Sequence, residues 1–198
     1  TTVAFGLVAG VLMTGVGVAL SPQILRWMDT PESVMRESVT YLQIYFAGSL
    51  GFVMYNVLVG ILQAVGDSRH PLYYLIVSSV INLVLDLLFI TGFHTGVGGA
   101  AVATVISQIV SALLCFWQLL RTKESYGLKI RKIRFDKGIL VQIIKIGLPS
   151  GVQNSIIAFA NVIVQSNINA FGEMAMAGYG AYTKVEGFGF LPINSFTM

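Results

Sequence analysis

The chain has 198 residues, of which 55% are hydrophobic and only 11% are charged, and its mean hydropathy is +0.78. An average soluble domain carries about 25% charged residues, so the charged surface of a water-soluble protein is largely missing. With a single cysteine as well, these values exclude a disordered chain, a disulfide scaffold and almost any cytosolic enzyme. The net charge is +3, but seven of the twelve Lys and Arg residues lie between Arg121 and Lys137, which makes a local basic segment.

Long stretches without charge predict membrane-spanning helices. A helix rises about 1.5 Å per residue, so about 20 apolar residues cross the ~30 Å hydrocarbon core. Four stretches qualify without any charge, and two more qualify with charged residues inside them. The six expected spans are Val3–Leu25, Val39–Val65, Leu72–Thr91, Gly99–Leu120, Ile146–Phe171 and Ala177–Met198. The sequence therefore predicts an all-α integral membrane protein, a polytopic helical bundle.

The distribution of Lys and Arg predicts how these helices cross the membrane. Loops on one side carry nine Lys and Arg residues, eight of them between Arg121 and Lys145, whereas loops on the other side carry two. Positively charged loops stay on the cytoplasmic side. We therefore expect a multi-pass protein of a bacterial-type plasma (inner) membrane, with the linker 121–145 in the cytoplasm.

The linker itself has a helical pattern at its end. Ile139, Leu140, Ile143 and Ile144 repeat at helical spacing beside basic residues, which favours an amphipathic helix at the lipid headgroups. A plain positively charged loop is an equally good interpretation. A nucleic-acid partner is not expected, because the flanking helices hold this segment at the membrane.

Asp86 is the most informative residue, because an acid near the middle of a spanning helix costs about 2.5–3.5 kcal/mol on insertion scales. Asn82 lies four residues earlier, on the same helical face. Asp86 is either the charge-bearing group of an ion or proton site, or a neutral, hydrogen-bonded residue that locks two helices together. The first interpretation is favoured, since Asn or Ser would make such a lock at lower cost.

The following span offers a partner for Asp86. Its polar stripe consists of Thr104, Ser107, Gln108 and Ser111. Thr104 is expected at about the depth of Asp86, so Asp86, Asn82 and Thr104 could give oxygen ligands to Na⁺ or hold a titrating carboxyl group. Ser107 and Gln108 are candidates for lining a cavity, although small hydroxyl residues such as Ser107 and Ser111 also serve helix packing.

Two later spans carry weaker candidates for a cavity lining. The fifth span has a polar stripe that either lines a substrate path or packs against other helices. The stripe consists of Gln153, Asn161, Gln165 and Asn169, with Asn154 alongside. In the sixth span Lys184 and Glu186 are about 200° apart around the helix, so they cannot pair directly. Lys184 either extends to the membrane interface or faces a cavity, where it would be a substrate or coupling residue.

Sequence motifs for ATP-driven or hydrolytic chemistry are absent. The sequence has no P-loop, no HExxH and no serine elbow. We therefore expect no enzyme and no cofactor other than a coupling ion.

Five sequence motifs occur in order and at sensible spacing over nearly the whole chain. They are Gly60–Pro71 (GILQAVGDSRHP), Asn82-x-x-x-Asp86-x-x-Phe89, Gly96–Gln108, Gly147-Leu-Pro149 followed by Gln153, and Ala181–Pro192. Together they resemble one transporter family, the multidrug and toxic compound extrusion (MATE) transporters.

The resemblance implies twelve helices in two six-helix lobes, of which this chain would be an internal fragment with helices three to eight. Residues 1–120 would be the last four helices of the first lobe, 121–145 the loop that joins the lobes, and 146–198 the first two helices of the second lobe. Such transporters export cationic or amphipathic small molecules in exchange for H⁺ or Na⁺. The resemblance leaves the substrate, the ion and the oligomeric state open.

The family's cation-linked network also falls on residues of this chain. In several members Asn and Asp of helix five and Thr of helix six form it, and these match Asn82, Asp86 and Thr104. The acidic residue that completes the network belongs to helix one, outside this chain. Some branches carry a Glu in helix seven, but Ser155–Phe159 contains no acid. Coupling is therefore expected in the first lobe.

Two other functions fit the sequence. One is a lipid-linked precursor flippase of the wider superfamily, which needs a cationic cavity for pyrophosphate; the charged pair in the late helices is Lys184 with Glu186. The other is a non-transporting membrane subunit, in which Asp86 would be purely structural.

Overall fold

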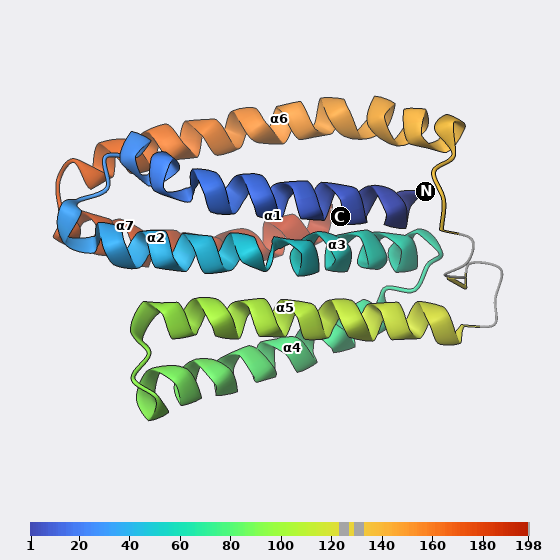
Figure 1. The fold of residues 1–198 in the computed structure, drawn as a ribbon, viewed down its shortest axis with the longest axis horizontal. Helices are drawn as coiled ribbons and strands as arrows, with labels where there is room; N and C mark the ends of the chain where they lie inside the picture. Colours follow the sequence, from blue (N-terminus) through green and yellow to red (C-terminus); the bar gives the residue numbers. More distant parts are fainter. Residues whose placement is uncertain (123–126, 129–132, 198) are drawn as a thin grey trace. The chain divides into compact units, whose positions relative to one another are not determined.

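The computed structural model describes residues 1–122, 127–128 and 133–197, and no strand occurs over these ranges, which confirms the all-α prediction (Figure 1). The elements in chain order are α1 (Thr2–Trp27), α2 (Glu32–Ala47), α3 (Ser49–Ala64), α4 (Arg69–Leu87), the π-helical turn η1 (Leu88–Gly92), α5 (Gly96–Arg121), α6 (Lys137–Asn169) and α7 (Glu173–Thr197).

Most of these helices have the length and composition of membrane spans. In the described residues, α1, α4 with η1, α5 and α6 are long and apolar enough to cross a membrane, and the bent pair α2–α3 makes a fifth candidate. These five coincide with the first five expected spans. The sixth expected stretch, Ala177–Met198, falls in α7 up to Thr197, but α7 is not among the candidate spans found in the described residues.

The second expected span, Val39–Val65, is not one straight helix. It is divided at Gly48 into α2 and α3, which meet at an angle of 45°. The Gly48 N–H is shared between the carbonyl oxygens of Ile44 and Tyr45, at 3.2 and 3.1 Å. A side chain on Gly48 would collide with α5, since its Cβ would lie 2.9 Å from Val105 Cβ. The bend therefore occurs where the backbone lies close against α5.

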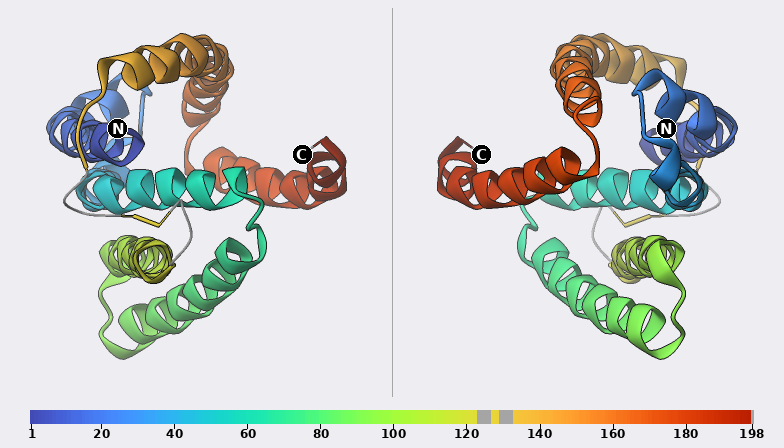
Figure 2. Two further views of the ribbon diagram at one scale, coloured as in Figure 1. Left: turned by 90° about the vertical axis from the view of Figure 1, so that its right-hand side faces the viewer. Right: turned by 90° about the vertical axis from the view of Figure 1, so that its left-hand side faces the viewer.

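The chain divides into two compact units. The first contains Thr1–Ser21 and Glu37–Pro149, and the second contains Pro22–Arg36 and the described residues from Ser150 onward. In the first unit α4 packs along α5, and α3 packs on α5 as well (Figure 2). Close helix approaches in this unit rely on glycine: a Cβ on Gly6 of α1 would lie 2.9 Å from Val57 of α3.

The apolar core of the first unit lies at the end of the bundle where α3 and α5 finish. Its buried members are Val3, Leu58, Leu62, Cys115 and Leu119. The described parts of the linker cover this core: the side chains of Leu128 and Ile133 pack against it, and the Leu128 N–H donates to the Leu119 carbonyl at 2.9 Å.

The linker then passes directly into α6. The Asp136 carboxylate accepts the Ile139 N–H at 3.1 Å and so caps the helix, and Thr1 accepts the Asp136 N–H at 2.9 Å. Residues 137–145 are therefore helical and continuous with the fifth expected span. Linker residues 123–126 and 129–132 lie outside the described part of the chain, and the position of this helix at the headgroups stays a prediction.

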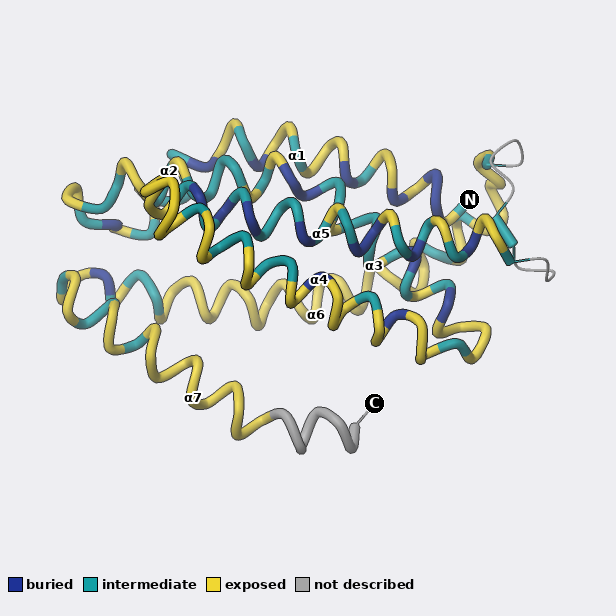
Figure 3. The backbone as a smooth tube through the Cα atoms, turned by 90° about the horizontal axis from the view of Figure 1, so that it is seen from below, coloured by how far each residue is buried: buried dark blue, intermediate teal, exposed yellow. Residues whose placement is uncertain are grey.

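The second unit is built mainly from the later part of α6 and from α7. Their described side chains are mostly exposed, in contrast to α1 and α5 (Figure 3). The buried exception is Asn169, whose amide donates to the Met28 carbonyl at 2.8 Å and accepts a hydrogen bond from Gln165 at 2.8 Å.

Candidate functional site

The candidate site begins with two polar residues in the last two turns of α4, just before η1. Asn82 and Asp86 are one helical turn apart and partly buried. Asn82 Nδ2 and Asp86 Oδ1 are both buried, and neither has a hydrogen-bond partner among the described residues. An apolar surrounding makes such atoms costly, about 1–3 kcal/mol each, so they need a functional or structural explanation.

The polar stripe of α5 contains residues of two kinds. The hydroxyl groups bond to their own helix: Thr104 donates to Ala100 at 3.0 Å, Ser107 to Thr104 at 2.8 Å and Ser111 to Ser107 at 3.1 Å. Gln108 differs, because its buried Oε1 accepts no hydrogen bond from any described residue. Asn82, Asp86 and Gln108 are called the α4–α5 polar trio below.

Two contacts fix the antiparallel register of α4 and α5. Near the turn, Phe89 lies against Gly99, whose Cβ would be 2.9 Å from Phe89 Cβ. At the other end, the Tyr74 hydroxyl donates to Gln118 Oε1 at 3.3 Å. Asn82 and Asp86 lie between these contacts on α4, and so do Thr104 and Gln108 on α5. The register therefore places Asp86 at about the level of Thr104 and Asn82 at about the level of Gln108.

A small cavity of about 60 Å³ adjoins this part of α5. Thr104 and Gln108 line it together with Gly48 and Ser49 at the α2–α3 bend. Ser49 is buried and shares a 3.0 Å hydrogen bond with Thr14 of α1. The sequence analysis did not single out Ser49, since nothing in an uncharged run marks which serine lies at a bend; its position after Gly48 was the available signal.

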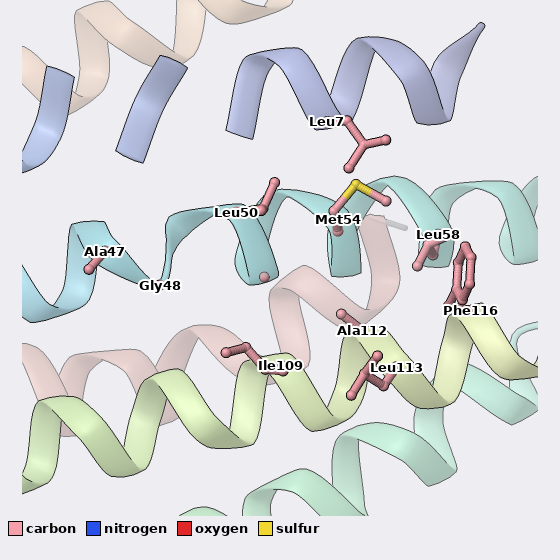
Figure 4. Close-up of a pocket in the computed structure, with 11 residues that line it drawn as sticks. Leu7, Ala47, Gly48, Leu50, Met54, Leu58, Ile109, Ala112, Leu113 and Phe116 are labelled. Carbon is pink, nitrogen blue, oxygen red and sulfur yellow. The ribbon is translucent and has the colours of Figure 1, made fainter. Parts of the chain in front are cut away.

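A larger and wholly apolar cavity lies on the other side of Gly48, with a volume of about 370 Å³ (Figure 4). Met54 and Leu58 of α3, Leu7 of α1 and Phe116 of α5 are among its lining residues. Its size is at the lower end of the range for small-molecule sites. It offers hydrophobic contact, whereas the polar trio offers charge and hydrogen bonds.

Asp86, Asn82 and Thr104, the residues predicted for the cation site, thus lie at similar heights along the axes of α4 and α5, but their hydrogen bonding differs. Asn82 and Asp86 carry unsatisfied atoms, while the Thr104 hydroxyl already donates to its own helix. That hydroxyl keeps lone pairs that can contact a cation. Across the described residues, no group of three or more His, Cys, Asp or Glu could hold a metal ion.

The candidates of the second unit are exposed. Gln153, Asn154 and Asn161 of α6 lie on exposed positions, as do Lys184 and Glu186 of α7. Glu186 accepts a hydrogen bond from the Tyr182 hydroxyl at 3.2 Å. The cavity lining expected of these five side chains stays a prediction.

Comparison with known proteins gives consistent matches. A family model described as MatE matches residues 1–88. The chain is 33% identical over 189 residues to the probable multidrug resistance protein YpnP of Bacillus subtilis (strain 168). This match covers 92% of this chain and 42% of YpnP. It is 25% identical over 175 residues to the multidrug export protein MepA of Staphylococcus saprophyticus, over 88% of this chain and 39% of MepA.

Solved structures agree with these relatives. The inward-facing structure of a multidrug resistance MATE family transporter of the MOP superfamily superimposes with a TM-score of 0.87 and 28% identity. The match covers 96% of this chain and 44% of that one. The chain therefore spans less than half the length of the proteins it matches.

Proposed function

We propose, from the premise that this chain belongs to the MATE transporter family, that the protein exports cationic or amphipathic small molecules through a membrane in exchange for H⁺ or Na⁺. The coupling ion binds at Asp86, with Asn82 and Thr104 beside it. Transport proceeds by alternating access of one substrate path to the two sides of the membrane.

The observation that carries this proposal is the pair of unsatisfied atoms on α4. Asn82 Nδ2 and Asp86 Oδ1 are buried in a helix that is apolar enough to span a membrane, and no described residue bonds to them. A carboxylate in this position is costly unless an ion or a proton compensates its charge. A purely structural Asp would use its oxygens to bind a neighbouring helix.

Ion binding can drive export only if the ion and the substrate prefer different states. Neutralising Asp86 removes the cost of a buried charge and so favours a different packing of α4 against α5. Substrate affinity is then lower in the ion-bound state, and the substrate leaves. The coupling free energy is set by the factor by which the bound ion changes the affinity for the substrate.

The apolar cavity beside α3 and α5 supports the choice of substrate class. Its walls, which include Met54 and Phe116, suit the hydrocarbon part of an amphipathic compound. The names of YpnP and MepA, a multidrug resistance and a multidrug export protein, agree with such a substrate. Gln153, Asn154, Asn161, Lys184 and Glu186 remain candidates for the rest of the path.

The same proposal includes the topology. Residues 1–120 belong to the first lobe, 121–145 form the cytoplasmic linker, and 146–198 begin the second lobe. The excess of Lys and Arg in the linker supports this orientation in a bacterial plasma membrane.

Dye efflux tests the proposal directly. The complete transporter that contains this chain is expressed in a pump-deficient bacterium, and ethidium efflux is compared between the wild type and Asp86→Asn at equal amounts in the membrane. We expect the variant to lose at least about tenfold in efflux rate, because it can no longer carry the coupling charge. Asp67→Asn is the matched control, since Asp67 pairs with His70 in the turn between α3 and α4.

Each result has a clear meaning. Unchanged efflux in Asp86→Asn would make Asp86 a structural residue and remove the proposed coupling site. No efflux from the wild type would overturn drug export and favour the flippase. Steps in Na⁺ or pH with the active protein then identify the ion.

A further inference from the structure

We propose that Gln108 supplies the α5 oxygen of the coupling-ion site, so that the ion is held between the Asp86 carboxylate on α4 and the Gln108 amide oxygen on α5. This inference rests on the proposed function, because it assigns a further binding residue to the same site. It concerns a residue for which the sequence predicted only a cavity lining.

The first argument comes from counting donors and acceptors in the α4–α5 polar trio. The buried atoms that lack a described partner are one donor, Asn82 Nδ2, and two acceptors, Asp86 Oδ1 and Gln108 Oε1. When Asp86 is ionised, one donor cannot satisfy two acceptors. A Na⁺ ion would contact both oxygens, and a proton on Asp86 would turn the carboxylate into a second donor. Either coupling ion therefore corrects the imbalance.

The second argument comes from position. The α4–α5 register sets Gln108 at about the level of Asn82, one turn from Asp86. Gln108 is also one turn from Thr104, so the two side chains share a face of α5. Both line the small cavity next to Gly48 and Ser49. The residues that line this cavity come from α1, α2, α3 and α5, so the shared level of Gln108 and Asn82 is the observation that relates Gln108 to α4.

The third argument is the contrast with a second glutamine on α5. Gln118 is partly buried, like Gln108, but its Oε1 accepts a hydrogen bond from the Tyr74 hydroxyl at 3.3 Å. Gln118 shows how a glutamine holds α4 and α5 together in this protein. Gln108 Oε1 accepts no such bond from the described part of α4. This favours a role of Gln108 in binding the ion over a role in joining the two helices.

The experiment compares ion dependence in the complete transporter, purified and reconstituted in liposomes. Substrate transport is measured against the concentration of Na⁺ and, separately, against pH in wild type, Gln108→Leu and Gln108→Glu, with Gln118→Leu as the matched control. A direct titration with each ion, read from intrinsic tryptophan fluorescence, reports binding without transport.

We expect Gln108→Leu to raise the half-saturating concentration of the coupling ion about tenfold, as for a lost hydrogen bond to a charged group, in both the transport assay and the fluorescence titration. Gln108→Glu keeps an oxygen at this position and is expected to recover ion binding relative to Gln108→Leu. Gln118→Leu should shift the ion dependence less than about twofold, since Gln118 lies outside the site.

Failures of the two proposals can be told apart. If Asp86→Asn abolishes transport and Gln108→Leu has the ion dependence of the wild type, Gln108 is not a ligand, while the coupling site stands. If Asp86→Asn transports normally, the coupling site itself is wrong. If Gln108→Leu does not accumulate, Gln108→Met and Gln108→Glu take its place. Equal ion affinity in Met, Glu and wild-type proteins would overturn the inference.

Discussion

Helices α5 and α6 are both long and apolar, and both carry a stripe of polar residues, but they differ in what covers the stripe. In α5, Ser107 and Ser111 are buried, and Gln108 is partly buried. In α6, Gln153 and Asn161 are exposed in the described chain. The same sequence pattern therefore leads to two different environments.

The difference follows from the residues between the polar ones. Helix α5 carries Gly99 and Ala103 on one side and Ala101 and Ala112 on the opposite side, all buried, so two neighbouring helices, α3 and α4, can approach it closely. The corresponding part of α6 carries large, exposed side chains such as Ile156 and Phe159. Small residues predict which polar stripe becomes a closed interface, because close packing requires them.

The largest expected effect distinguishes Gly48, which packs against α5, from Gly151 of α6. Gly48→Ala should lower the free energy of unfolding by about 1–3 kcal/mol, since the new methyl group meets the branched side chain of Val105. Gly151→Ala in α6 meets nothing within 4 Å in the described structure and should stabilise the helix by about 0.5–1 kcal/mol. Thermal unfolding of the complete protein in detergent measures both.

A negative effect of Gly151→Ala would be informative. It would mean that another part of the complete protein packs on this face of α6, so that the contrast with α5 is a property of the described residues alone. Gly60→Ala on α3, also in open space, is the control within the first unit.

A smaller effect is expected at the end of α6, where its stripe is buried. Asn169→Ala removes the hydrogen bonds to Met28 and Gln165 and should cost about 1–2 kcal/mol. Asn167→Ala loses only a bond to the Ile163 carbonyl of its own helix and should cost less than about 0.5 kcal/mol. Equal melting temperatures for the two variants would contradict the described packing of Asn169.

The smallest effect concerns the start of α6. Asp136→Ala removes the cap on Ile139 and should lower stability by about 1 kcal/mol or less, whereas Asp136→Asn keeps a capping oxygen and should be nearly neutral. Hydrogen exchange of the first turn of α6 distinguishes local fraying from global unfolding. Equal protection in all three proteins would show that Thr1 and the linker hold this turn without the cap.

Much of the fold could be predicted because each helix leaves a simple signal in the sequence. Long apolar runs locate α1, α4 and α5 within a few residues, since a membrane span must be largely apolar. The start of α6 was placed nine residues too late, at Ile146 in place of Lys137, because its first turns carry Lys137 and Lys145. The break at Gly48 was not predicted. It depends on contact with Val105, a residue about sixty positions away, and no local feature encodes that distance.

The candidate site was predictable to a similar extent. The spacing of four residues between Asn82 and Asp86 predicts that they share a face of their helix. The polar stripe of the next helix identifies Thr104 and Gln108 as candidate site residues. The sequence could not show that Gln118 Oε1 accepts a hydrogen bond from Tyr74 whereas Gln108 Oε1 has no described partner, because this difference depends on packing. The exposure of Gln153 and Asn154 likewise depends on packing and not on pattern.

Cys115 gives the first unit a built-in reporter. It is the sole cysteine of this chain, it is fully buried between α5 and α3, and the linker residues Leu128 and Ile133 cover the same core. A thiol reagent can reach its sulfur only while the helices or the linker move apart. The rate at which the reagent modifies Cys115 therefore reports how often this end of the bundle opens. Measuring this rate with and without substrate or coupling ion shows whether either one changes the opening.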